Sequence, residues 1–231
     1  MQVAYCKVMS QVRSMTNFPT PILTIDVVLL ELRNETLSVG ILTRQAEPFV
    51  GQPALPGGYV HVDKDADTEA TARRVIRDKV GLNDVFCEQL ATFSGPDRDP
   101  RGWSATVVYS ALIRGPRPEA TGLEWRSVDA LGDLAFDHNM IVAAAMDRLR
   151  AKGSWSNLPA FLLTPTFTYS ELRRTYELIL GVRLNDSAFR RKIDEMDLIE
   201  PLQGQMSKST ARPAQLYRLK DAVVRTLNRR I

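Results

Sequence analysis

The stretch that decides the fold is Gly57-Gly58-Tyr59-Val60-His61-Val62-Asp63, which leads into Ala72-Arg73-Arg74-Val75-Ile76-Arg77-Asp78-Lys79-Val80-Gly81-Leu82. The glycine pair predicts a tight turn, because glycine permits backbone angles that other residues avoid. Residues 67–80 predict a helix that is capped by Asp67 or Thr68 and ends at Gly81. Backbone N–H groups at the glycine turn can approach a bound ligand closely.

Length and composition indicate a folded protein of one large domain or two modest ones. Of the 231 residues 44% are hydrophobic and 25% are charged, which excludes extensive disorder. There is neither an apolar run long enough to cross a membrane nor a secretory signal at the N-terminus, so we expect a cytoplasmic protein. Two cysteines and two histidines form no metal-ligand pattern, and two reduced thiols are favoured over a disulfide.

The first two thirds of the chain predict an α/β sandwich. Residues 1–20 show no clean periodicity and are expected to form an arm, either mobile or packed as an edge. An amphipathic helix is expected at residues 137–152, with Gly153 closing it. Apolar, β-branched segments predict the strands 22–30, 37–44, 90–93 and 104–113, with a turn at 33–36 and a polar loop at 94–102.

The pattern changes after Gly153 and predicts a winged helix-turn-helix. A short connector, residues 155–159, precedes a helix at 169–180 and a turn at 181–184. Asp186 is expected to cap a second helix that runs to about Met196. Two short strands, 198–201 and 214–219, flank a basic loop at 202–213 that reads as the wing. We therefore expect two domains, 1–153 and 154–231.

Charge is distributed unevenly between these domains. Residues 1–153 hold 17 basic and 19 acidic side chains, and residues 154–231 hold 13 basic and 8 acidic ones. A net charge of +5 on the smaller domain indicates a polyanionic partner, although a basic surface can also serve solubility alone.

The basic side chains of the C-terminal domain predict contacts with double-stranded DNA. The outward face of the second helix would enter the major groove, where arginine can contact guanine. Wing residues would meet phosphates or the minor groove, and the preceding helix would lie near the DNA backbone. A competing interpretation is a helical docking module with a solvated basic face. The predicted DNA-binding residues are Arg173, Arg174, Ser187, Arg190, Arg191, Lys208 and Arg212.

The opening stretch resembles the Nudix class of pyrophosphate hydrolases, whose helix reads Arg-Glu-aliphatic-x-Glu-Glu-x-Gly-aliphatic. The arginine, glycine and aliphatic positions of this pattern match, but Val75, Asp78 and Lys79 occupy its glutamate positions. Mg²⁺ requires several oxygen ligands, so the one remaining carboxylate would bind it poorly. We therefore predict a cavity that binds a nucleotide diphosphate without cutting it, with no catalytic residues and no metal site.

The chain as a whole resembles the Nudix-related transcriptional regulators, bacterial repressors of NAD-metabolism genes. This resemblance implies a homodimer on a palindromic operator, with ADP-ribose or another NAD-derived nucleotide as effector and no required cofactor. Some members keep several acidic residues in the box, whereas this chain keeps only Asp78. The residues that carry the resemblance are 54–63, 73–74, 81–82, 99–103, 135–138, 189–193 and 211–214.

A diphosphate held without metal needs other positive charge. For Arg74 an internal ion pair is an equally good interpretation, and surface pairing competes for Arg44 and Arg101. His138, at a helix start, is expected to satisfy a hydrogen bond rather than to catalyse. The predicted effector-binding residues are Arg44, Gly57, Gly58, Arg74, Lys79 and Arg101.

The leading hypothesis is a transcriptional repressor of NAD biosynthesis or related genes, and not an enzyme. The first alternative is an ADP-ribose pyrophosphatase with an accessory winged helix. The second is a winged helix that binds protein.

Overall fold

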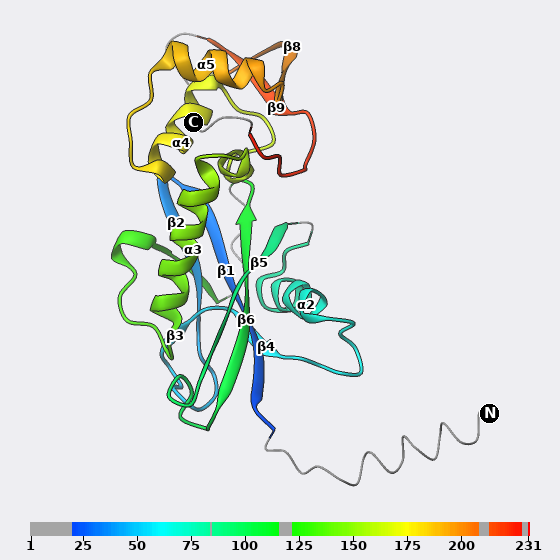
Figure 1. Ribbon diagram of the computed structural model, residues 1–231, viewed down its shortest axis with the longest axis vertical. Coiled ribbons are helices and arrows are strands. Elements are labelled where there is room, and N and C mark those ends of the chain that lie inside the picture. Colours follow the sequence, from blue (N-terminus) through cyan, green and yellow to red (C-terminus); the bar gives the residue numbers. More distant parts are fainter. Residues whose placement is uncertain (1–19, 84, 116–121, 208–212, 228–230) are drawn as a thin grey trace, which may run out of the picture.

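The computed structural model describes residues 20–231 apart from 84, 116–121, 208–212 and 228–230. It is an elongated molecule with a sheet sandwiched between helices at one end and a smaller helical domain at the other (Figure 1). The predicted arm and the predicted wing residues Lys208 and Arg212 lie outside the described residues, except for Thr20 of the arm.

A mixed sheet of seven strands forms the centre of the larger domain. Its order is β3-β2-β1-β6-β5; β4 pairs with β1, β7 pairs with β2, and β1 runs parallel to β6. The strands are β1 (Ile22–Arg33), β2 (Thr36–Thr43), β3 (Pro53–Ala54), β4 (Gly57–Tyr59), β5 (Phe86–Gly95), β6 (Ser104–Ile113) and β7 (Leu123–Ser127). Asn34 and Glu35 both adopt positive φ in the two-residue turn between β1 and β2, as a tight hairpin turn requires.

Two helices cover the two faces of this sheet, which confirms the predicted α/β sandwich. Helix α2 (Thr68–Val80) buries Val75 and Ile76 against one face, while α3 (His138–Gly153) buries Ile141 and Leu149 against the other. Strand β1 serves both layers because alternate side chains point to opposite faces. A short 3₁₀ helix, η1 (Val128–Ala130), follows β7.

The glycines at the ends of the two helices play different parts. Gly81 caps α2 in the left-handed conformation at φ +71°, and Asp67 accepts a hydrogen bond from Ala70 N at the other end, both as predicted. Gly153 does not close α3 in this way, because it is the last helical residue and Ser154 follows as the cap. A Cβ atom at Gly153 would lie 3.1 Å from Pro159 Cγ, so this glycine serves close packing.

The C-terminal domain is a winged helix-turn-helix built from η2 (Leu158–Leu162), α4 (Tyr169–Leu180), α5 (Asp186–Glu195), β8 (Ile199–Ser207) and β9 (Ala214–Leu219). Three details differ from prediction. Asn185, not Asp186, caps α5 by accepting from Ala188 N at 2.9 Å. The expected connector is largely buried and continues into η2, and β8 extends well into the expected wing loop.

The two domains share one continuous apolar core, which includes α3, η2, α4 and the sheet face beneath α3. The Tyr176 hydroxyl, fully buried, donates to Ser156 O at 3.0 Å. The C-terminal segment returns to the same junction, where Asn157 bonds Val223 O and Arg225 N. The smaller domain is therefore packed onto the larger one.

None of the described helices has the length and apolar character needed to cross a membrane.

Candidate ligand cavity and nucleic-acid interface

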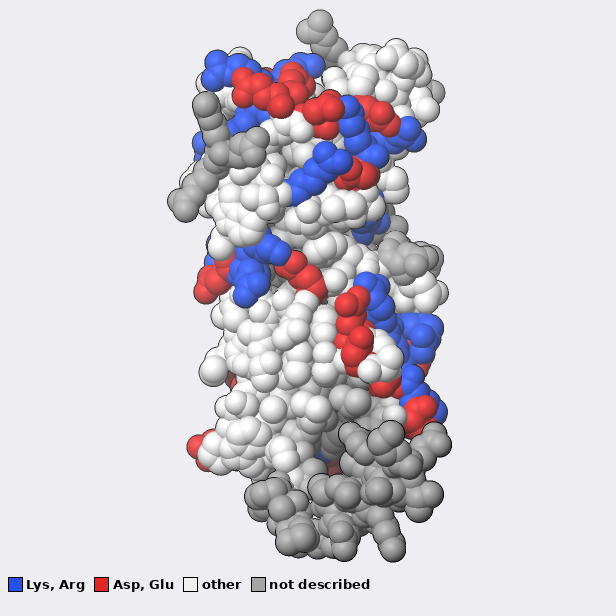
Figure 2. All heavy atoms as spheres, turned by 45° about the vertical axis from the view of Figure 1, so that its right-hand side comes forward, with Lys and Arg blue, Asp and Glu red and all other residues white. Residues whose placement is uncertain are grey.

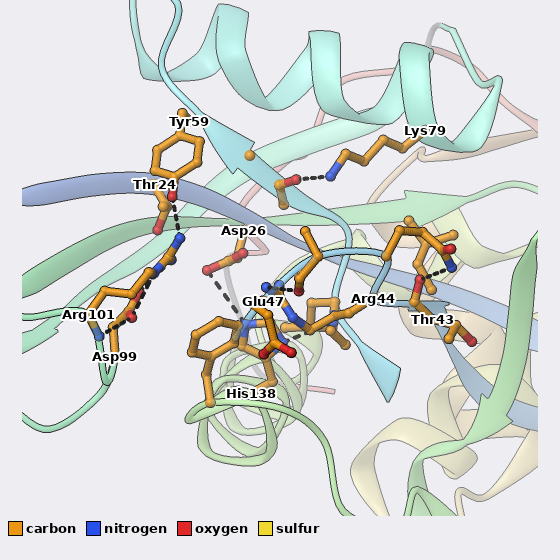
Figure 3. Close-up of a pocket in the computed structure, with 18 of the residues that line it drawn as sticks. Thr24, Asp26, Thr43, Arg44, Glu47, Tyr59, Lys79, Asp99, Arg101 and His138 are labelled. Carbon is orange, nitrogen blue, oxygen red and sulfur yellow. Dashed lines mark hydrogen bonds and ion pairs between the residues drawn. The ribbon is translucent and has the colours of Figure 1, made fainter. Parts of the chain in front are cut away.

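A cavity of about 710 Å³ opens between β1, β4, the end of α2 and the start of α3, a size suited to a ligand of nucleotide dimensions (Figure 3). Five of the predicted effector-binding residues line it: Arg44, Gly57, Gly58, Lys79 and Arg101. Residues 45–47 and Phe136 complete much of the remaining wall.

Lys79 reaches the cavity from the last turn of α2. Its ammonium group donates to Gly57 O, and no carboxylate among the described residues pairs with it. Although much of the side chain is exposed, desolvation of the ammonium group lowers the pKa of Lys79; the charge of Asp26 raises it, and the charges of Arg44 and Arg74 lower it. An anion beside the ammonium group would raise this pKa again.

Arg101 reaches the cavity from the loop between β5 and β6. The buried Asp99 carboxylate accepts hydrogen bonds from its guanidinium group at 3.0 and 2.6 Å, and the pairing lowers the pKa of Asp99. The same guanidinium group contacts the hydroxyl and the ring face of Tyr59. Asp99 and Tyr59 therefore orient Arg101 at the cavity. The aspartates of this loop had suggested an ion pair for Arg101, whereas Tyr59 was not predicted as a partner.

Arg44 shapes the cavity wall from the end of β2. It donates to the carbonyl oxygens of Pro48 and Ala46 at 2.7 and 3.1 Å, and its guanidinium group lies 4.6 Å from the ring centroid of Phe136. No carboxylate among the described residues forms an ion pair with it. Burial and the nearby charge of Arg101 lower the pKa of Arg44, whereas the charges of Asp26 and Asp99 raise it.

Arg74 lies outside the cavity lining. It forms a two-pronged ion pair with Asp65, with nitrogen–oxygen distances of 2.8 and 2.7 Å, and donates to Tyr59 O. This pairing lowers the pKa of Asp65 and ties α2 to the loop before it. The internal ion pair, one of the two predicted roles of Arg74, is thus present.

The residues at the Nudix glutamate positions do not fit a divalent cation. Val75 is buried in the core beneath α2, Asp78 pairs with Arg77 at 2.9 Å, and Lys79 brings positive charge to the site. No group of three His, Cys, Asp or Glu side chains within the described part of the chain is arranged to hold a metal ion.

Asp26 and His138 line the cavity floor. His138 Nδ1 accepts from Leu55 N at 3.0 Å, as expected of a histidine that satisfies a hydrogen bond, and burial lowers the pKa of His138. Its Nε2 atom, which therefore carries the proton, lies 3.8 Å from Asp26 Oδ2. The sequence analysis missed Asp26; an aspartate inside an otherwise apolar strand was the available signal.

The exposed face of α5 carries three of the predicted DNA-binding residues, Ser187, Arg190 and Arg191. Arg191 is 78% exposed and lies 3.8 Å from Glu195. Arg190 stacks on Tyr169, 4.7 Å from the ring centroid, and its guanidinium group donates to the Tyr217 hydroxyl of β9 at 3.4 Å.

Two other predicted DNA-binding residues lie on α4, and both form ion pairs. Arg173 pairs with Glu177 at 2.8 Å and with Asp186 at 3.1 Å, and Arg174 pairs with Glu35 of the larger domain at 3.1 Å. Figure 2 shows basic and acidic side chains interspersed at the winged-helix end, so this face is not uniformly positive.

The fold and the two candidate sites define a class of protein: a Nudix-like domain with a cavity lined by basic side chains, packed onto a winged helix. The sequence profile of the NrtR DNA-binding winged helix domain matches residues 159–219. The "ADPR responsive transcriptional repressor NtrR" of Acinetobacter baylyi is 37% identical over 210 residues, which are 88% of this chain and 84% of that protein. The chain belongs to the NrtR family.

Solved structures agree with this assignment. The NrtR of Shewanella oneidensis in complex with a 27mer DNA has a TM-score of 0.84 and 32% identity, covering 90% of this chain and 99% of that one. Its Nudix domain in complex with ADP ribose has a TM-score of 0.54 and 30% identity, covering 61% and 97%. A shorter match, 33% identical over 118 residues, is to the ADP-ribose pyrophosphatase of Methanocaldococcus jannaschii and covers 49% of this chain and 67% of that protein.

Proposed function

We propose that this protein is a DNA-binding transcriptional repressor whose Nudix-like domain binds ADP-ribose as effector. The observation that carries the proposal is a cavity of nucleotide size that presents Arg44 and Lys79 without carboxylate partners among the described residues, in a chain that also carries a winged helix. The related repressor is described as responsive to ADPR, and the related Nudix domain was solved with ADP ribose.

The diphosphate would lie between Lys79, Arg44 and Arg101. Lys79 supplies, without a metal, the positive charge that a divalent cation supplies in a hydrolase. Neither a metal cage nor a free general base is present at the Nudix helix, since Val75 is buried and Asp78 faces Arg77. We therefore expect the ligand to be held and not cut.

The winged helix would place α5 in the major groove, with Arg191 and Arg190 toward base edges and Ser187 toward the backbone. Arg173 and Arg174 would contact phosphates from α4 after exchanging their present carboxylate partners, and Lys208 and Arg212 would act from the wing. A homodimer would present two such helices to a palindromic operator in genes of NAD biosynthesis or related metabolism.

A thermal-shift screen with ADP-ribose, NAD and nicotinamide mononucleotide tests the effector, and gel shifts with palindromes near the gene test the operator. We expect ADP-ribose to raise the melting temperature most and the protein to retard one palindrome. Absence of any shift by all three nucleotides would contradict the effector assignment.

The alternative, an ADP-ribose pyrophosphatase with an accessory winged helix, draws on the similarity to the Methanocaldococcus jannaschii enzyme. Incubation with ADP-ribose and Mg²⁺ separates the two functions. Prompt release of AMP would establish a hydrolase, whereas intact ADP-ribose after many hours would support the sensor.

A further inference from the structure

Asp26 is a buried acid in a cavity otherwise suited to anions. Strand β1 places it opposite Gly57 of β4, and its side chain is only 10% exposed. The approach to Gly57 is so close that a Cβ atom there would lie 2.0 Å from Asp26 Oδ1. Gly57 lies in strand β4 and has no positive φ, so the predicted glycine turn is not found here; glycine is required at position 57 by the close approach of Asp26.

The Asp26 carboxylate lacks a hydrogen-bond donor among the residues that the structure describes. The protonated Nε2 atom of His138 is directed toward it from 3.8 Å, which is beyond hydrogen-bonding distance. Asp26 lines the open cavity, so a ligand that displaces water from it must supply donors to this carboxylate, because burial of an unsatisfied charge is costly. The cations of the cavity lining donate elsewhere: Lys79 to Gly57 O, Arg44 to Pro48 O and Arg101 to Asp99.

A metal ion is a poor candidate for the missing partner. Lys79, Arg44 and Arg101 surround the same cavity, and no cluster of three potential ligand side chains exists in the described ranges. A neutral donor is compatible with these cations, and so is an anionic ligand that carries such donors.

We infer that Asp26 is a specificity-determining residue that accepts hydrogen bonds from the vicinal hydroxyl groups of a ribose, while the cations around it hold the attached phosphates. Figure 3 shows the Asp26 carboxylate in the middle of the cavity, with Arg101 on one side and Lys79 on the other. A phosphorylated ribose carries hydroxyl donors and phosphate acceptors a few ångströms apart, so one ligand satisfies both groups. This inference rests on the proposed function and adds which group selects the sugar.

The test compares Asp26→Asn with the matched variant Glu47→Gln, which changes an exposed carboxylate of the same cavity. Calorimetry measures the dissociation constants of ADP-ribose, ADP and ribose 5-phosphate for both variants and the wild type. Both substitutions remove one negative charge, so the charge effect alone strengthens the binding of all three anions in both variants.

If Asp26 binds the distal ribose, Asp26→Asn weakens ADP-ribose and ribose 5-phosphate by at least about tenfold but not ADP. If it binds the ribose of the adenosine half, ADP-ribose and ADP weaken but ribose 5-phosphate does not. Equal changes for all three ligands, as expected for Glu47→Gln, would overturn the inference. Failure of the wild type to bind any of them would refute the proposed function instead.

A crystal structure of the wild type with ADP-ribose gives an answer that does not depend on the folding of the variant. We expect a ribose hydroxyl oxygen at about 2.5–3.0 Å from an Asp26 carboxylate oxygen. A water molecule or a phosphate oxygen in that place would overturn the inference.

Discussion

Lys79 is the residue that most clearly separates this cavity from a hydrolytic centre. It occupies a position where the Nudix pattern has a metal-binding glutamate, and its ammonium group faces the cavity beside Gly57 O. A positive side chain at this point would attract a diphosphate and repel a cation that activates water.

Replacing Lys79 by Gln should weaken ADP-ribose binding by about tenfold to a hundredfold, because a hydrogen bond to a charged group contributes about 1.5–3 kcal/mol. Operator affinity without effector should be unchanged. Calorimetry and gel shifts measure the two quantities, and Lys64→Gln, an exposed lysine outside the cavity lining, serves as the control. Undiminished ADP-ribose binding by Lys79→Gln would remove Lys79 from the site.

His138 makes the stability of the protein depend on pH. Burial keeps its imidazole neutral and lowers its pKa, whereas the unfolded chain protonates at about 6.5. The unfolded state therefore binds more protons below that pH, and stability falls as the pH drops from about 6.5 toward the lowered pKa, by at most about 1.4 kcal/mol per pH unit.

Urea denaturation between pH 7.5 and 5 measures this loss. His138→Asn, which keeps an acceptor for Leu55 N, should flatten the slope in this range, whereas His61→Asn on the exposed loop should not. Equal slopes for His138→Asn and the wild type would show that another group is responsible.

At the scale of an element, helix α3 runs from the cavity to the C-terminal domain. Its first residue, His138, lies in the cavity floor, and its last residue, Gly153, packs against the C-terminal domain. The Arg98–Asp137 ion pair at 2.8 Å also ties the start of this helix to the β5–β6 loop that carries Arg101.

Gly153→Ala should destabilise the protein by about 1 kcal/mol, although alanine in a helix ordinarily stabilises by about that amount. The added methyl group would lie 3.1 Å from Pro159 Cγ and 3.3 Å from Ile179 Cγ2. Denaturant melts measure the change. Combination with Pro159→Ala should remove the cost, and a more stable Gly153→Ala in the wild-type background would refute the packing argument.

Helix α5 should carry operator recognition independently of the cavity. Arg191→Ala and Arg190→Ala should each abolish specific gel shifts while leaving the stabilisation by ADP-ribose intact, since both side chains are distant in sequence from the cavity lining and absent from it. Arg150→Ala, an exposed arginine on α3, is the control and should bind DNA normally. If ADP-ribose no longer stabilised the α5 variants, the claim that DNA recognition and ligand binding are separate would be wrong.

At the scale of the whole molecule, the sequence predicted the class of fold and the kinds of element well. Apolar periodicity located the long strands and α3, because burial on one or two faces leaves a strong pattern. It did not reveal β3 and β4, since two or three residues carry no periodicity, and it also missed β7. It located only part of β5 and only the start of β8. The capping of α5 was assigned one residue late because Asn185 and Asp186 are both good caps.

The candidate site was predictable as a set of cations but not as a geometry. Five of the six predicted effector-binding residues line one cavity. Arg74 instead forms an ion pair with Asp65, an alternative that the sequence alone left open. Asp26 and Phe136 come together with them only through the pairing of β1 with β4 and the packing of α3. Such contacts depend on tertiary structure, and the only local signal was the position of Asp26 inside an otherwise apolar strand.

One apolar core spans both domains. We expect a ligand in the cavity to affect DNA contacts through this shared packing. ADP-ribose can lower operator affinity only by binding more tightly to an arrangement that misplaces the recognition helices. In a homodimer such an arrangement changes the spacing of the two copies of α5.

The most direct test of a cavity that grips without cutting is the fluorescence anisotropy of labelled operator DNA with the protein and Mg²⁺, recorded for hours after one addition of ADP-ribose. We predict a fall in anisotropy that persists, because the effector is bound and not consumed. A fall that reverses while AMP accumulates, or no fall at all, would contradict the account.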